Sequence, residues 1–376
     1  MRDLMASRAR PILRLLRRDE RGAIGVLVAI FIGAGVLTGM GALVIDVGRL
    51  YQERAELQNG ADAAALGVAK SCALGTCAPG VAPGYADANA SRLTGGSAAV
   101  GLVCGSGNLA VCPAPTGAKT DCPAAPSAGI GYVQVYTSTQ TSSGSTLLPP
   151  IFARSLLGNS GDAGTTVSSC SQAVWGAPSA ATTAAVTISA CEWDQATQQG
   201  TAFAPPPPYP PDPVPAAAAD QVLTLNNTGA NNNGCATEPA GSDGPASFGW
   251  AAHPAGTCAL PVSGPSFPGR TQTRVSFSCQ LVLSNAQQDQ TPILVPVYVS
   301  VNGVPGNITY VLKGFADFVV TGYHMPGFDA ADWLNPANDC VGTDYCLNGY
   351  FTQGLVPTTG SLGDTDLGAS VIELTG

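Results

Sequence analysis

"RGAIGVLVAIFIGAGVLTGMGALVIDVGRLYQERAELQNGADAAALGVA", residues Arg21–Ala69, joins an apolar, glycine-rich run to a charged, alanine-rich run with no proline in between. The first run, residues 22–45, has no charged side chain. As a helix it would be roughly 36 Å long, which is enough to cross a hydrocarbon core of about 30 Å. Within lipid, a single segment can pair all of its peptide groups only as a helix. The stretch therefore predicts a transmembrane helix at residues 22–45.

The charges on either side of this run predict its orientation. Residues 1–21 hold seven arginines and three acids, a net charge of +4, whereas the whole chain carries −9. Because positively charged flanks stay in the cytoplasm, we expect a basic cytoplasmic tail at 1–21 and an exterior chain from about residue 46. The alternative is a cleaved signal peptide. Its apolar region would be shorter, about 7–15 residues, and would end in a small-residue cleavage site that is not evident here.

Helical periodicity continues beyond the apolar run. Apolar residues recur at steps of three, four and seven, and Arg49 can pair with Asp46 and Glu53 on neighbouring turns. We therefore expect one helix that leaves the membrane and continues over residues 46–74. Its narrow apolar stripe must pack on the protein's own domain or on a neighbouring subunit. The stripe consists of Val47, Leu50, Leu57, Ala61, Ala64 and Val68.

Two glycines inside the apolar run form a Gly-x-x-x-Gly pair, Gly35 and Gly39. Without a Cβ atom at these positions, a second membrane helix can approach closely. Glycine is also common in membrane helices in general, so incidental placement is the alternative.

Composition favours a turn-rich β domain for the exterior part. The chain has 46 glycines and 30 prolines, while only 11% of residues are charged and 6% are aromatic. Beyond its short tail the chain is acidic. It therefore lacks the basic body that a nucleic-acid-binding domain needs, and that class is excluded.

All twelve cysteines lie beyond the apolar run, from Cys72 to Cys346. An even number on one side of a membrane segment predicts disulfides in an oxidising compartment. Reduced, buried thiols are the alternative. A zinc site is disfavoured, because the chain has no Cys-x-x-Cys pair and only two histidines.

Several exterior segments are expected to be strands, among them one with Tyr132, Gln134 and Tyr136 on one face. Asn302-Gly303 is a tight-turn signal, although Pro305 implies a longer loop, and "PPIFARSLLG" at 149–158 reads as a short helix. Two of these segments contain Cys170 and Cys191, which are therefore expected on β structure. The segments expected to be strands are 131–140, 164–176, 184–193, 274–284, 292–301 and 308–323.

The fold class is therefore α+β, with a single-pass transmembrane helix that continues as a long pilin-like helix into a disulfide-rich, mainly antiparallel β exterior domain. Residues 203–219 are proline-rich and predict an extended linker, or alternatively a ligand for an aromatic groove of a partner. The predicted divisions are the tail 1–21, the membrane helix 22–45, the exterior helix 46–74, a cysteine-containing α+β region 75–202, the linker 203–219 and a β-rich region 220–376.

The chain shows little sign of catalytic or metal chemistry. Neither His253 nor His324 is accompanied by a Gly-x-Ser-x-Gly nucleophile motif, and no phosphate-binding glycine motif follows a strand. We expect no catalytic residue, cofactor, metal or small-molecule substrate. Cys340 and Cys346 are expected to close a loop. One acidic cluster is a candidate calcium site, but its spacing does not match a calcium-binding loop. It consists of Asp329, Asp332, Asp339 and Asp344.

Three pieces of the opening stretch resemble the N-terminal segment of TadE/TadG-like proteins of the Tad (tight adherence) system, which assembles Flp pili in bacteria. They are "RGAIGVLVAIF", "ALVIDVGRLYQERAELQN" and "GADAAALGVA", and the resemblance covers roughly residues 18–70. Counted from Gly22, the fifth residue is Val26, where prepilins carry Glu. This is more similar to TadG than to TadE, and it weakens the case for prepilin-peptidase cleavage at Arg21–Gly22. The metal-binding Asp-x-Ser-x-Ser of some longer TadG-like proteins is absent.

The resemblance implies a structural or assembly component of a Flp pilus, anchored in the cell membrane with its C-terminal domain outside. Its partners would be membrane lipid and other Tad/Flp pilus proteins, contacted through helix packing. Two alternatives remain open. One is a membrane-anchored surface binding protein, adhesin-like or wall-binding, and the other is an anchored enzyme with its centre near His253 or His324.

Overall fold

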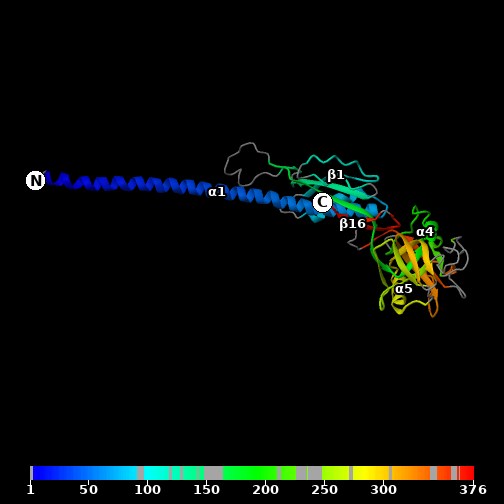
Figure 1. Cartoon of the computed structure of the whole chain (residues 1–376). Coiled ribbons are helices and arrows are strands. Elements are labelled where there is room, and N and C mark those ends of the chain that lie inside the picture. The colour runs from blue at the N-terminus through cyan, green and yellow to red at the C-terminus, as the bar shows by residue number, and fades with distance from the viewer. Residues whose placement is uncertain are drawn as a thin grey trace. The chain divides into compact units, whose positions relative to one another are not determined.

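The computed structural model in Figure 1 describes most of the chain. The described residues are 3–90, 97–117, 121–127, 130–141, 144–147, 164–209, 213–225, 235, 248–270, 274–304, 307–338, 345–356, 362–363 and 365–376. The expected helix at 149–158 and Cys340 lie outside them.

Helix α1 is a single helix over Asp3–Ala73, 71 residues long, so it includes both the apolar run and its charged continuation. The uninterrupted helix confirms the expectation drawn from its periodicity. It ends because Gly75 adopts a left-handed φ of 80°. The N–H groups of Thr76 and Cys77 then donate to the Ser71 carbonyl, each at 2.9 Å. A Cys72–Cys77 disulfide closes the loop that follows.

The contacts divide the chain into two compact units. One comprises residues 1–60, 86–101 and 137–169, and the other comprises 61–85, 102–136 and 170–376. Most of the strands belong to the second unit.

A short helix, α2 (Ala82–Asn89), follows the 3-10 turn η1 (Pro79–Val81) and lies along α1. Two glycines of α1 make this close contact possible. A Cβ atom at Gly60 would lie 2.8 Å from the Ala86 carbonyl oxygen, and one at Gly67 would collide with the Tyr85 ring. Glycine at these positions therefore sets how near α2 can approach.

The first sheet has the strand order β1-β2-β3-β16-β14, with β15 also paired to β3. Strand β16 runs antiparallel to β3, and β14 runs parallel to β16. The bounds are β1 Ser97–Gly105, β2 Gly131–Gln140, β3 Ser168–Pro178, β14 Gly354–Leu355, β15 Leu362–Gly363 and β16 Ala369–Leu374.

The second sheet has the order β10-β5-β7-β9-β11-β13-β6, and β12 pairs with β11. An additional β10–β11 pairing closes β10, β5, β7, β9 and β11 into a ring. All but one of its pairings are antiparallel, the exception being β10 with β5. The bounds are β5 Val186–Ser189, β6 Gln221–Thr224, β7 Phe248–Ala251, β9 Ser266–Arg270, β10 Ile293–Val304, β11 Asn307–Met325, β12 Phe328–Ala330 and β13 Cys346–Thr352.

The main apolar core lies inside this second sheet and includes Val186, Phe248, Val297 and Phe318. Its aromatic rings pack in pairs, such as Phe318 against Phe351 at 5.1 Å between centroids. The remaining elements are β4 Ala181–Ala184 paired with β8 Ala259–Val262, the helices α4 Ala190–Ala196 and α5 Phe277–Asp289, and the 3-10 turns η2 Ala217–Ala219 and η3 Pro336–Asn338.

Two segments expected to be strands are partly helical. Residues 274–284 were expected to form a strand, but α5 begins at Phe277, because the Ser276 hydroxyl accepts the Cys279 N–H as a helix cap. Cys191 was likewise expected on a strand and lies in α4, whose cap is Ser189. Cys170 does lie on a strand, β3.

The expected turn at Asn302-Gly303 is also wrong, because both residues belong to β10. They pair with Thr309 and Ile308 on β11. The hairpin therefore turns later than its Asn-Gly signal indicated. The strands expected at 131–140, 292–301 and 308–323 are present as β2, β10 and β11.

The proline-rich segment is tied to β13 at several points. The Ala204 N–H donates to the Phe351 carbonyl, and the Tyr209 hydroxyl lies 2.5 Å from that of Tyr350. Strands from both sides of this segment share the second sheet, since β5 precedes it and β7 and β10 follow it.

Five disulfides join described cysteines that follow the apolar run, and Cys346 is also disulfide-bonded. The five pairs are Cys72–Cys77, Cys104–Cys112, Cys122–Cys170, Cys191–Cys235 and Cys258–Cys279. The prediction of a disulfide-rich domain is confirmed.

Candidate functional site along helix α1

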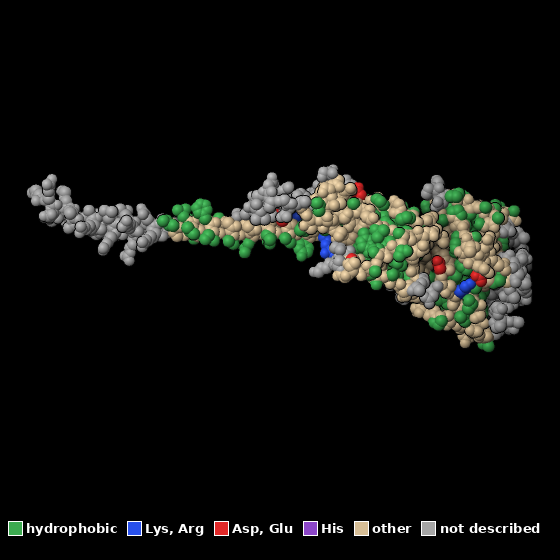
Figure 2. All heavy atoms as spheres, turned by 90° about the horizontal axis from the view of Figure 1, so that it is seen from above, with side chains coloured by type: hydrophobic (Ala, Val, Ile, Leu, Met, Phe, Trp, Pro, Cys, Tyr) green, Lys and Arg blue, Asp and Glu red, His purple; other side chains and the backbone are tan. Residues whose placement is uncertain are grey.

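The large side chains of the apolar half of α1 are exposed, although Ala42 is only 7% exposed. Large side chains such as Phe31, Leu37 and Leu43 are 65–75% accessible, and Figure 2 shows hydrophobic side chains along this part of the rod. The helix is long and apolar enough to cross a membrane. Leaving so much apolar surface in water is unfavourable at about 25 cal/mol per Å². This surface therefore needs a cover of lipid or of other apolar helices.

Glycines in this half have no steric role within the described chain. A Cβ atom added at Gly35 or Gly39 would meet nothing within 4 Å, and the same holds at Gly33 and Gly41. Gly35 and Gly39 share one face of the helix, being one turn apart. The chain itself thus leaves open the space that a Gly-x-x-x-Gly pair offers to a second helix.

The helix changes character just beyond the apolar run. Glu53 and Glu56 are 9% and 8% exposed. Burial raises the pKa of Glu53, while a hydrogen bond with Thr139 and the charge of Arg49 act in the opposite direction. The Arg49–Glu53 interaction agrees with the i,i+4 pairing expected from the sequence.

The apolar stripe in the charged continuation of α1 packs only in part on the protein's own chain. Leu57, Ala61, Ala64 and Val68 are at most 2% exposed, whereas Val47 is 41% exposed. Leu50, also part of the predicted stripe, is half-buried. The sequence allowed the stripe to pack either on the protein's own domain or on a neighbouring subunit. From Leu57 onward, the structure shows that it packs on the protein's own chain.

Hydrogen bonds hold this part of α1 to the ends of two strands. The Thr137 hydroxyl of β2 donates to the Leu57 carbonyl at 3.2 Å. The Ser169 hydroxyl of β3 donates to the side-chain oxygen of Gln58. Leu57 and Gln58 lie beside the buried Glu53, so the contact of α1 with the domain begins within about two turns of Asp46.

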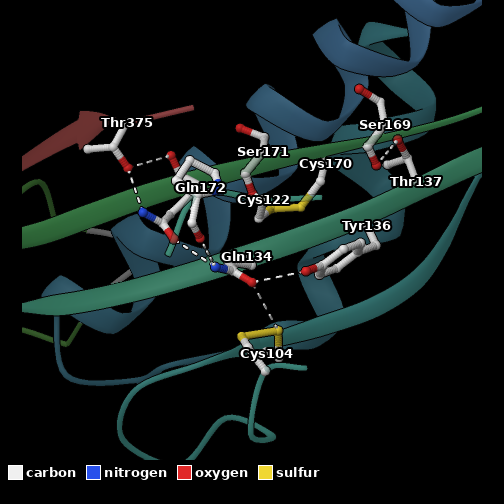
Figure 3. The surroundings of a disulfide bond; sticks show 12 residues. Cys104, Cys122, Gln134, Tyr136, Thr137, Ser169, Cys170, Ser171, Gln172 and Thr375 are labelled. Atoms are coloured by element: carbon white, nitrogen blue, oxygen red, sulfur yellow. Dashed lines mark hydrogen bonds between the residues drawn. A yellow bond between two sulfur atoms is a disulfide. The ribbon is translucent and has the colours of Figure 1, made fainter. Parts of the chain in front are cut away.

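A buried polar network braces the first sheet near two disulfides, as Figure 3 shows. The Gln134 amide donates to the Pro123 carbonyl at 2.8 Å and to the Gln172 side-chain oxygen at 2.7 Å. The Tyr136 hydroxyl donates to Gln134 at 3.1 Å, and the Gln172 amide donates to Thr375 at 2.9 Å. Gln134 and Tyr136 therefore lie on one face of β2, as expected, and their hydrogen bonds link β2 to β3.

The two histidines have ordinary partners. His253 Nε2 lies 3.3 Å from the Ser276 hydroxyl, but that oxygen already accepts an N–H bond as the cap of α5. His324 Nδ1 lies 2.9 Å from an Asp329 oxygen.

Asp329 and Asp332, two of the acidic residues considered for calcium, each bind different partners within the chain. Asp332 accepts the N–H groups of Leu334 and Asn335 and the Asn348 amide, at 2.8–2.9 Å. Burial alone would raise the pKa of Asp332, but these bonds and one with Asp220 lower it. Asp339 and Asp344 lie outside the described residues. Among the residues that are described, no group of three or more His, Cys, Asp or Glu side chains could hold a metal ion.

These features define a class of protein: one with a long, membrane-capable N-terminal helix followed by a disulfide-braced, β-rich part. Residues 22–71 match a family model described as "Putative Flp pilus-assembly TadE/G-like". The N-terminal segment of this chain is therefore TadE/G-like, with bounds close to those expected from its motifs. No curated protein and no solved structure matches the chain.

Proposed function

We propose that this protein is a membrane-anchored structural or assembly component of a bacterial Flp (Tad, type IV-like) pilus system. The observation that supports this proposal most directly is that the two halves of one TadE/G-like helix differ in exposure. The large side chains of its apolar half are exposed, while the apolar stripe of its continuation is buried in the protein's own chain from Leu57 onward. Such a helix can anchor the chain in a membrane and still offer its apolar face to other helices.

The proposed orientation places residues 1–21 in the cytoplasm and the β-rich part outside. The net charge of +4 on the tail supports this direction. The disulfides of the β-rich part support it independently, since disulfides persist in oxidising compartments.

The proposed mechanism is structural and non-catalytic. The segment 22–45 contacts membrane lipid, and the face with Gly35 and Gly39 packs against helices of other Tad/Flp pilus proteins. The space above both glycines, empty of other described atoms within 4 Å, supports this packing role.

Deleting the gene and examining cells by electron microscopy tests the assignment. Loss of surface fibres, restored by the wild-type gene, is the expected result. Normal fibres in the deletion strain, together with lost attachment to a surface, would instead favour the adhesin-like or wall-binding alternative.

The packing face is tested in the same strain with a matched pair of variants. We expect the double variant Gly35→Leu, Gly39→Leu to reduce the number of fibres, because its side chains keep a second helix away. The control, Gly33→Leu with Gly41→Leu, adds the same side chains at glycines that are equally open within the chain. Equal fibre numbers in the two double variants would rule out the packing role.

Protease added to spheroplasts tests the orientation. The disulfide-containing part must be digested while the tail stays protected. Survival of the whole chain in intact spheroplasts, with digestion only after lysis, would reverse the proposed topology.

A further inference from the structure

The first tyrosine or tryptophan of the chain, Tyr51, stands just beyond the apolar run. Its side chain is 73% exposed. Tyr51 shares a face with Val47 and Arg54 at i, i+4 and i+7 spacing, and Val47 is 41% exposed. Glu53, which is buried, lies about 200° further around the helix. Tyr51 therefore lies on the side of α1 opposite the buried Glu53, and on its own side the contact with the domain begins two turns further out, at Gln58.

The height of Tyr51 above the apolar run follows from helix geometry. Tyr51 is six positions after Ile45 in the chain, which places its Cα roughly 9 Å beyond the end of that run. The headgroup region on each side of a bilayer is about 5–7 Å thick. Side chains on a helix point back toward its N-terminus, which here is toward the membrane. The Tyr51 ring and hydroxyl thus reach back into the headgroup region.

The chemistry of this face fits a lipid surface. Tyrosine and tryptophan concentrate at membrane interfaces because the ring is apolar and the hydroxyl can bond to water or headgroups. Val47, one turn nearer the apolar run, contributes apolar surface, and Arg54, one turn further out and half-buried, adds positive charge to this face.

We propose that Tyr51, with Val47 and Arg54, forms an interfacial anchor that binds the phospholipid headgroups of the outer surface of the membrane. The inference rests on the membrane span proposed above. The anchor fixes the depth of α1 in the bilayer. Because the contact with the domain begins at Glu53 and Leu57, it also holds that end of the domain close to the lipid surface.

Quenching by brominated lipid tests the anchor. The full-length Tyr51→Trp variant is reconstituted in phosphatidylcholine vesicles that carry bromine near the headgroup end of the acyl chain. We expect the emission added over the wild-type chain to be mostly quenched. The matched control is Tyr85→Trp, another exposed helical tyrosine, which contacts α1 at Gly67. Gly67 is roughly 33 Å beyond Ile45, so the emission added by this variant should stay unquenched.

A third variant separates failure of the anchor from failure of the span. Leu43→Trp replaces a side chain that is 65% exposed within the apolar run, and lipid brominated deeper in the acyl chain should quench it. Quenching at position 43 without quenching at position 51 would overturn the anchor and leave the span intact. Quenching at neither position would overturn both. Quenching at position 51 that disappears when other pilus proteins are reconstituted alongside would assign this face to a protein partner and overturn the lipid assignment.

Discussion

Asp317 is a buried acid in the second sheet, and its protonation is coupled to folding. It lies on β11 between Leu294 of β10 and Thr352 of β13, and it is 6% exposed. Its carboxyl occupies the space that a side chain at position 354 would need, which accounts for Gly354. Burial raises the pKa of Asp317 from 3.8 to about 7, because the charged form loses its hydration.

The pKa of Asp317 predicts that the protein becomes less stable as pH rises from about 4 to about 7. In this window the folded state keeps the proton and the unfolded state releases it, so the free energy of unfolding falls by about 1.4 kcal/mol per pH unit. Asp317→Asn should remove this part of the pH dependence, as measured by thermal unfolding of the detergent-solubilised chain at pH 5 and pH 7. The control Asp289→Asn, at an exposed residue that ends α5, should leave it unchanged. An unaltered pH dependence in Asp317→Asn would refute the coupling.

At the scale of elements, α1 has glycines of two kinds. Gly60 contacts α2, where a Cβ atom would lie 2.8 Å from the Ala86 carbonyl oxygen and 3.4 Å from the Ala90 Cβ atom. Gly48 has nothing within 4 Å. The first is required by packing, while the second only lowers the helix propensity.

This difference predicts opposite effects of the same substitution. Gly60→Leu forces the backbone of α2 away and should lower the free energy of unfolding by about 2 kcal/mol. Gly48→Leu should raise it by up to about 1 kcal/mol, since leucine favours the helix. Urea unfolding gives the two values, and hydrogen exchange at the amides of α2 locates the effect. Equal protection of α2 in both variants would contradict the packing account.

At the scale of the whole molecule, disulfides supplement a core that contains many alanines. Alanine buries little area per residue, so covalent links contribute a larger share of stability. The bonds differ in the length of chain that they close: 48 residues separate Cys122 from Cys170, but only five separate Cys72 from Cys77.

Loop length predicts how much each bond stabilises the chain. Removing the Cys122–Cys170 bond with alanines should cost about 4 kcal/mol, against about 2 kcal/mol for the Cys72–Cys77 bond, because the longer loop gains more entropy in the unfolded state. Urea midpoints of the two double variants measure this order. A larger loss from the Cys72–Cys77 pair would show that native contacts around the bond, and not loop closure, dominate.

Local properties of the sequence determined the membrane-capable apolar run, the continuous helix and its TadE/G-like character, as well as the strands β2, β10 and β11. Hydropathy and helical periodicity depend on neighbouring residues, so the apolar run at 22–45 and its charged continuation could be read directly. The same local patterns misassigned residues 274–284. Their apolar spacing fits strand and helix alike, and the cap at Ser276 decided for the helix.

Only the tertiary structure decided which distant segments meet. It paired the cysteines, closed the ring through β10 and β11, buried Leu57 but not Val47, and placed Asp317 where its charged form is unfavourable. These outcomes depend on contacts between residues far apart in the chain, whose free energies arise from burial and mutual packing. The sequence by itself therefore determined that this protein has a membrane-capable helix and a disulfide-rich β part, and the folded structure decided which face of that helix the chain covers itself.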